Sequence, residues 1–187
     1  MSKYEDRKIK LPDRAELEEA LQEALDVARS EGSHVALAGG VAMQLLGSPR
    51  LTKDVDFVAD LELRGLTEVG RLVFDGVDGG QSLLASNGVE VDVIVRRDDY
   101  RDLYDKALNN ADLVLGIPVL TPEYLAATKY ASGRARDQDD LDFLIAERLC
   151  DEEKVGVILR RHLGHHTVRE WRYFVEESKF RTKRGRR

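Results

Sequence analysis

The stretch AGGVAMQLLGSPRLTKDVDF, residues 38–57, gives the clearest sign of how the chain folds. It begins where a short apolar run, residues 34–38, ends at the pair Gly39-Gly40. An apolar run that stops at glycines predicts a buried strand, here followed by a helix of about two turns. The stretch then enters a second predicted strand, residues 54–59, in which polar and apolar side chains alternate at first. We therefore expect a strand–helix–strand unit.

Three aspartates on two predicted strands are the candidate catalytic and metal-ligating residues. Asp54 and Asp56 are two residues apart and so share one face of their strand. Asp92 lies in VEVDVIV, residues 89–95, whose side chains alternate between polar and apolar over most of its length. If the two strands are neighbours, the carboxylates converge into an oxygen-rich set that suits Mg²⁺, and two such ions could stabilise a phosphoryl displacement. Glu90 shares the face of Asp92 and is the alternative third acid.

The glycine pair is the candidate phosphate-binding element. Glycine lets a backbone approach a ligand closely, and the N–H groups at the start of a helix favour an anion. Gly39 and Gly40 occupy such a position, with 13 residues between Gly40 and Asp54. The alternative interpretation is a plain turn without a ligand.

The rest of the chain is expected to be mostly helical. Asp13 and Glu16 form a box-like start for a helix over residues 13–30, and Gly32 ends it. Further helices are predicted over 62–73, 98–109, 122–132, 137–149, 151–162 and 165–179, with a loop over 76–81 and a short strand within 111–120, interrupted by Pro118.

These elements predict the fold class and the organisation of the chain. We expect an α/β (α+β) protein with a small mixed sheet of three to five strands flanked by helices, followed by a C-terminal helical part. Residues 1–120 would form the α/β core, residues 121–178 a helical part packed on it, and residues 179–187 a basic flexible tail.

Composition excludes several classes of protein. The chain has 187 residues, 34% of them charged, and contains no apolar stretch of the roughly 18 residues that a membrane helix needs. Its single cysteine, Cys150, excludes an intramolecular disulfide framework, and the N-terminal residues lack the apolar core of a secretory signal. We therefore expect a cytoplasmic protein without a membrane partner.

Basic residues gather at the C-terminal end. The net charge is −6, but the last nine residues, KFRTKRGRR, hold six basic and no acidic side chains. Just before them, Trp171, Tyr173 and Phe174 interleave with Arg169 and Arg172. This pattern is compatible with stacking on nucleic acid, although aromatic residues on a helix more often pack on the core.

The stretch 38–57 together with VEVDVIV resembles the nucleotidyltransferase superfamily of the polymerase β type. Its members place Gly-Gly or Gly-Ser about a dozen residues before Asp-x-Asp, with a third acid on a later strand. The segment from Arg50 to Asp56 is similar to the minimal, AbiEii-like branch, and YLAATKYASGRARDQDDLDFLI, residues 124–145, resembles a helix motif of that branch. This branch contains toxins of toxin–antitoxin and abortive-infection systems.

The resemblance implies transfer of a nucleoside monophosphate from an NTP to an acceptor, with release of pyrophosphate. Asp54, Asp56 and Asp92 would ligate the Mg²⁺ ions, two being expected, and Asp92 would also take the proton of the acceptor hydroxyl. Positioning and charge neutralisation dominate such reactions, so glycines and basic residues would complete the site. The nucleotide-binding residues implied are Gly39, Gly40, Arg50, Lys129, Asp137 and Asp140, of which the last two would contact the nucleotide or orient Lys129.

The acceptor and the partners stay open at this level. An RNA such as a tRNA end, or a protein side chain, would accept the nucleotide, and a toxin-type role would bring an antitoxin protein as partner. An antibiotic nucleotidyltransferase acting on a small molecule is the second enzymatic interpretation. The alternative of another class is a catalytically silent module that binds an NTP or a partner.

Overall fold

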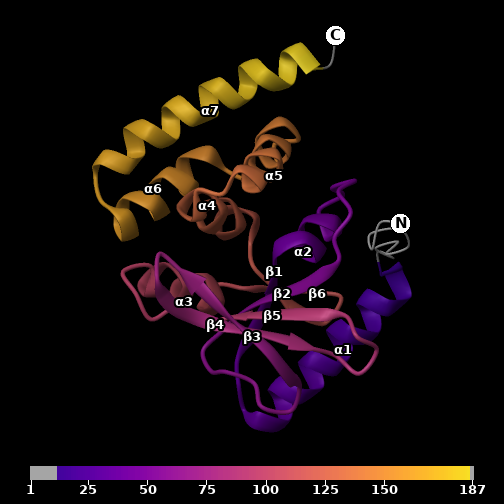
Figure 1. Cartoon of the computed structure of the whole chain (residues 1–187). Coiled ribbons are helices and arrows are strands. Elements are labelled where there is room, and N and C mark those ends of the chain that lie inside the picture. Colours follow the sequence, from indigo (N-terminus) through magenta and orange to yellow (C-terminus); the bar gives the residue numbers. More distant parts are fainter. Residues whose placement is uncertain (1–11, 186–187) are drawn as a thin grey trace, which may run out of the picture.

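The computed structural model describes residues 12–185 (Figure 1). The helices are α1 (Arg14–Glu31), α2 (Gly39–Leu45), α3 (Arg101–Asn109), α4 (Pro122–Ser132), α5 (Ala135–Ala146), α6 (Glu152–Leu163) and α7 (His166–Gly185). The strands are β1 (Val35–Ala38), β2 (Asp54–Ala59), β3 (Thr67–Phe74), β4 (Val77–Leu84), β5 (Glu90–Ile94), β6 (Asp112–Val114) and β7 (Ile117–Val119). The chain is thus an α/β protein that ends in a helical region.

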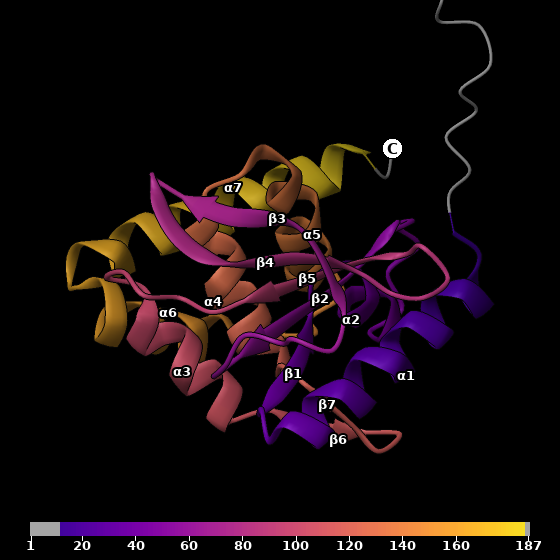
Figure 2. The same cartoon turned by 60° about the horizontal axis from the view of Figure 1, so that its bottom comes forward.

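All of these strands belong to one mixed sheet in the order β3-β4-β5-β2-β1-β7-β6. The pairs β2–β5 and β1–β7 are parallel and the others antiparallel. In Figure 1, α1 lies below the sheet and α4–α7 gather above it, and Figure 2 shows the same sheet from a tilted view with α3 beside it. The central position of β2 places its first residues next to both β1 and β5.

The first helix forms as its end signals predict. The Asp13 side chain accepts a hydrogen bond from the backbone of Glu16 at 2.9 Å, and the Glu16 side chain accepts one from Asp13 at 2.8 Å. Gly32 closes the helix in the left-handed conformation, with φ +69°. Because both ends are satisfied locally, α1 can present its buried face, which includes Leu17, Leu21 and Leu25, to the sheet.

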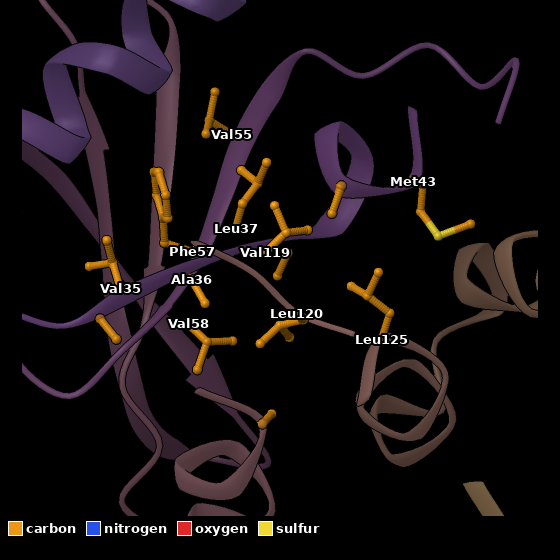
Figure 3. Close-up of a cluster of buried hydrophobic side chains, with 14 of the residues drawn as sticks. Val35, Ala36, Leu37, Met43, Val55, Phe57, Val58, Val119, Leu120 and Leu125 are labelled. Carbon is orange, nitrogen blue, oxygen red and sulfur yellow. The ribbon is translucent and has the colours of Figure 1, made fainter. Parts of the chain in front are cut away.

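A common core joins the sheet to the helical part. All four residues of β1 are buried, and Leu37 and Phe57 are fully enclosed on neighbouring strands. The same cluster continues toward the C-terminal helices (Figure 3). It includes Met43 of α2, Leu120 from the segment before α4, and Leu125 of α4. Truncating a side chain such as Phe57 to alanine costs about 3–5 kcal/mol in a core of this kind.

Two predicted elements were wrong, and the sheet is larger than expected. Residues 62–73, predicted as helix, contain the first seven residues of β3, and the predicted loop 76–81 lies mostly in β4. Asp75 and Gly76 form the tight turn between these strands with φ +49° and +81°. Position 80 of β4 needs a glycine, because a Cβ there would clash with the carbonyl oxygen of Val93 at 2.0 Å. Within residues 12–185 the sheet therefore has seven strands.

A second hairpin also escaped prediction. One interrupted strand was expected within residues 111–120, whereas the structure forms two short strands, β6 and β7, which pair across the turn at Leu115 and Gly116. Both turn residues have positive φ values, +52° and +82°. A leucine in that conformation gives no sequence signal for a turn.

The C-terminal helix is longer than expected. Helix α7 continues to Gly185 and so includes most of the segment that we expected to be a flexible tail from residue 179 onward. Side-chain pairs support this extension, because Lys179 contacts Glu152 at 2.8 Å and Arg181 contacts Asp142 at 2.7 Å. Residues 186–187 of that predicted tail lie outside the described part of the chain.

Candidate active site

The three candidate carboxylates meet where β2 and β5 run side by side. The parallel register places Asp56 opposite Asp92 and Asp54 opposite Glu90. On its other side, β2 places Asp56 opposite Ala38, the last residue of β1 before the glycine pair. Side chains at paired positions of adjacent strands share a face of the sheet. The two strands are therefore neighbours, and Asp54, Asp56 and Asp92 lie on one face of the sheet.

This carboxylate cluster is short of positive charge. Burial raises the pKa of Asp56 above its usual value, and the negative charge of Asp54 raises it further. Burial likewise raises the pKa of Asp92 to about 6, with repulsion from Asp56 adding to the effect although the Ser82 hydroxyl opposes it. One oxygen of Asp92, Oδ1, is buried without a hydrogen-bond partner. A cation placed here would relieve both the repulsion and the unpaired oxygen.

The glycine pair holds the carboxylate of Asp56. Gly40 donates its backbone N–H to Oδ2 of Asp56 at 3.3 Å. Gly39 has φ +55°, and a Cβ at Gly39 would lie 1.7 Å from that same oxygen. A Cβ at Gly40 would lie 2.3 Å from Oγ1 of Thr52, which in turn donates to Oδ1 of Asp54 at 2.7 Å. Any larger residue would displace this arrangement, so glycine is required at both positions.

A buried network of ion pairs lies beside the carboxylates. Lys129, on α4, is buried and donates to Oδ1 of Asp137 at 3.3 Å and to Oδ2 of Asp140 at 2.5 Å. Arg50, from the loop before β2, contacts the same oxygen of Asp140. Arg134 donates to Oδ2 of Asp137 at 2.8 Å. The charged groups of this network thus come from the α/β core and from the helical part together.

The network acts on the carboxylate cluster through its charge. The positive charges of Lys129 and Arg134 each lower the pKa of Asp56, so the network is close enough for its charge to act on this carboxylate. Burial by itself would raise the pKa of Asp137, but hydrogen bonds from Ser132 and Arg134 and the charge of Lys129 hold it below the usual value. The site therefore presents carboxylates on one side and cations on the other.

The structure shows which partners several of the predicted site residues contact. Asp137 and Asp140 lie in α5 and hold Lys129, one of the two roles expected of them. Arg50 is about two-thirds buried and already engaged by Asp140, and Lys129 is enclosed rather than exposed on a helix surface. Nucleotide contacts by these residues and by the glycine pair stay predictions.

Sequence reasoning missed three contributors to the site. Arg134 lies at the start of α5, directly after Gly133 ends α4 with φ +62°. Thr52 holds Asp54, and Ser82 of β4 donates to Glu90 at 2.7 Å. Gly133, between two predicted helices, indicates a break in the chain at which the neighbouring Arg134 could have been considered. Ser82 gave no signal because it follows directly after the predicted loop 76–81, and the sequence predicts no strand there.

A separate cavity of about 1120 Å³ lies at the opposite end of β2. Its lining includes Ala59, Asp60 and Arg97, and none of the predicted site residues. The chemistry-bearing residues and this cavity are therefore distinct features of the fold.

Within residues 12–185, no set of three or more His, Cys, Asp or Glu side chains is already arranged to hold a metal ion. Mg²⁺ commonly binds through only one or two protein carboxylates and completes its shell with water and substrate phosphates. Over the same residues, no helix is long and apolar enough to cross a membrane.

Comparison with known proteins gives a distant structural likeness. No protein-family model matches the chain, and no curated protein matches it. Among solved structures, the chain is similar to an antigenic nucleotidyltransferase-like protein from Paracoccidioides brasiliensis, with 18% identity and a TM-score of 0.41. The similarity covers 85% of this chain and 93% of that protein.

Proposed function

We propose that this chain is a Mg²⁺-dependent nucleotidyltransferase that moves a nucleoside monophosphate from an NTP to a hydroxyl group of RNA. The observation that carries the proposal is the meeting of Asp54, Asp56 and Asp92 on the adjacent strands β2 and β5. Close to them lie three cations held by Asp137 and Asp140, namely the buried Lys129 and the more exposed Arg50 and Arg134. Carboxylates for a divalent cation and cations for phosphates are the two requirements of phosphoryl-type transfer.

The residues present fit Mg²⁺. The unpaired Oδ1 of Asp92 and the raised pKa values of Asp56 and Asp92 mark a set of hard oxygens whose negative charge is only partly offset by the cations of the protein. Asp54, Asp56 and Asp92 would hold the metal together with oxygens of the nucleotide. When bound, Mg²⁺ would supply neutralisation of the charge that develops on the phosphate oxygens.

The reaction assigns a distinct task to each side of the site. The acceptor oxygen forms a bond to the α-phosphorus, and the bond from that phosphorus to the oxygen bridging to the β-phosphate breaks. Pyrophosphate carries away the electron pair, and the proton of the acceptor hydroxyl passes to the carboxylate of Asp92.

The cations would receive the phosphates of the NTP. Arg134 is the most accessible of them, with 46% of its side chain exposed, and it retains donors beyond its bond to Asp137. Lys129 and Arg50 add fixed positive charge from within the network. Asp137 and Asp140 are positioning residues in this scheme, because they hold Lys129 and Arg134 beside Asp56.

Transfer of label from each of the four α-³²P NTPs to total RNA, in the presence of Mg²⁺, tests the proposal. We expect labelled RNA from the natural chain and none from the Asp56→Asn variant. Asp75→Asn is the matched control, because Asp75 lies exposed in the β3–β4 turn with φ +49°, a conformation that asparagine tolerates. The control variant should label RNA at the natural rate.

Each other outcome contradicts the proposal in a specific way. Label on protein alone, in a parallel incubation with cell extract, would replace RNA by a polypeptide acceptor. Label only on an added aminoglycoside would identify a small-molecule enzyme. A rise in melting temperature with Mg²⁺ and NTP, without any pyrophosphate release, would identify a silent binding module. The toxin role and the antitoxin partner rest on the sequence resemblance alone and stay predictions.

A further inference from the structure

Positive charge is concentrated toward the C-terminal end of the sequence. Residues 151–187 contain eleven Lys and Arg against six Asp and Glu, whereas the whole chain has a net charge of −6. The stretch RRHLGHHTVREWRY, residues 160–173, spans the corner between α6 and α7 and has Glu170 as its one acidic residue. This corner is therefore the part of an acidic protein that attracts anions.

Four arginines of this corner are exposed and without ion pairs among the described residues. Arg160 and Arg161 lie in the last turn of α6, and Arg169 and Arg172 lie on α7. Elsewhere, most arginines are engaged by carboxylates, as in the pairs formed by Arg14, Arg29, Arg50, Arg71, Arg96, Arg97, Arg101, Arg134 and Arg181. Exposed arginines without an ion pair are available to an outside anion.

The same surface carries an exposed ring. Tyr173 is 69% exposed and follows Arg169 by four residues, so the two side chains lie on one face of α7. Its aromatic neighbours behave differently, because Trp171 is buried and donates to the carbonyl of Glu152 at 2.9 Å, and Phe174 packs against the core. Of the three aromatic residues in this segment, Tyr173 is thus the one presented to a ligand.

Two of the arginines also share a cavity. Arg160 and Arg172 line a space of about 590 Å³ between α6 and α7, together with apolar side chains such as Val157. Three glutamates, Glu152, Glu153 and Glu176, line the same cavity, so its lining carries no excess of positive charge. An incoming phosphate would therefore be held by the exposed arginines outside the cavity and not within it.

We propose that this surface, formed by Arg160, Arg161, Arg169, Arg172 and Tyr173, binds single-stranded RNA. The guanidinium groups would contact phosphates, for which their planar fork is suited, and the Tyr173 ring would stack on a base. The inference deepens the proposed function, on which the choice of RNA rests, by naming the surface that holds the acceptor. Helix α7 begins at this corner, and its second half packs on α5, where Arg181 pairs with Asp142 at 2.7 Å.

Binding of a fluorescein-labelled oligouridylate of about 20 nucleotides, followed by fluorescence anisotropy without NTP or Mg²⁺, tests the surface. The Arg169→Ala/Arg172→Ala variant should bind at least tenfold more weakly, and the slope of log K against log salt should fall by about 1.4, at about 0.7 for each phosphate that the variant no longer neutralises. The Arg29→Ala/Arg64→Ala variant is the matched control, because it removes two exposed arginines far from the corner. Its affinity and slope should equal those of the natural chain.

The ring is tested separately. Tyr173→Ala should weaken binding about fivefold or more, and Tyr173→Phe should restore it, because stacking needs the ring and not the hydroxyl. Equal loss of affinity in both variants would remove stacking from the proposal. Because Tyr173 is exposed, neither substitution opens a cavity.

The proposal would be overturned if the double-alanine variant lost no affinity, or if the control variant lost as much affinity as the double-alanine variant. It would also be overturned if polyglutamate displaced the labelled RNA as effectively as unlabelled oligouridylate does. This last result would identify a surface for acidic proteins. The Asp56→Asn variant should bind RNA normally. RNA binding without nucleotidyl transfer would thus contradict the proposed function alone, and transfer with unchanged RNA affinity in the arginine variant would contradict this inference alone.

Discussion

Replacing Gly39 by alanine tests whether the glycine pair positions Asp56 as the structure describes. Gly39 follows β1 directly and has φ +55°, a conformation that costs a residue with a Cβ about 1–2 kcal/mol. The added methyl group would also lie 1.7 Å from Oδ2 and 2.3 Å from Cγ of Asp56. These separations are far below van der Waals contact, so the carboxylate or the backbone must move.

The expected loss of stability can be separated into two parts. Backbone strain contributes about 1–2 kcal/mol, and overpacking of this kind contributes about 1–3 kcal/mol more. Gly32→Ala provides the matched control, because Gly32 has φ +69° and a Cβ there meets nothing within 4 Å. The control variant should lose the strain contribution alone, so the difference between the variants measures the overlap with Asp56.

Urea unfolding of both variants gives the two free energies, and transfer of label gives their activities. Gly39→Ala should be less stable than Gly32→Ala by about 1–3 kcal/mol and should lose about hundredfold in kcat/KM, as expected when a reacting group is displaced. Gly32→Ala should keep its transfer rate, because Gly32 only ends α1. Equal stabilities together with unchanged transfer by Gly39→Ala would refute the placement of Asp56 against the glycine pair.

Two further predictions concern buried charge. Lys129→Met should lower the free energy of unfolding by about 3–5 kcal/mol, since it leaves two buried carboxylates with fewer partners, whereas Lys53→Met removes an exposed pair and should cost less than about 1 kcal/mol in the same urea experiment. Asp92→Asn should abolish transfer yet stabilise the metal-free protein at neutral pH. The folded pKa of Asp92, about 6, lies above its unfolded value, so the natural chain loses stability as pH rises from about 4 to about 6. The advantage of the variant should therefore vanish near pH 4, and a constant difference in melting temperature across this range would contradict the assignment.

Local patterns predicted the part of the site that lies on strands. Asp54, Asp56 and Asp92 could be placed because alternation along a strand decides which side chains share a face. The parallel pairing of β2 with β5 then had to be assumed, and the structure supplies it. The capping box of α1 was equally predictable, because its hydrogen bonds span only three residues.

Elements whose stability comes from distant neighbours were the ones mispredicted. Strand β3 is an edge strand with mostly exposed or half-buried side chains, so it lacks the clear alternation that marks a half-buried strand. Strand β4 contains Gly79 and Gly80, which taken alone indicate a loop. The backbone of β5 lies so close to Gly80 that a side chain would not fit there, and the sequence does not show this neighbour. Helix α7 extends through the basic segment because α5 and α6 provide carboxylates for it.

The amino-acid sequence by itself determined the capped first helix, the strand that carries Asp54 and Asp56, and the spacing of the glycine pair, since each depends on residues within one turn or a few strand positions. Only the tertiary structure decided that Lys129 is buried between Asp137 and Asp140, that Arg50 reaches across from the α/β core to Asp140, and that Arg134 pairs with Asp137 in the same network. Charges on a helix look alike in a sequence whether they face solvent or a partner. Burial and the approach of a distant segment set their pairing, and these arise only when the helical part packs on the sheet.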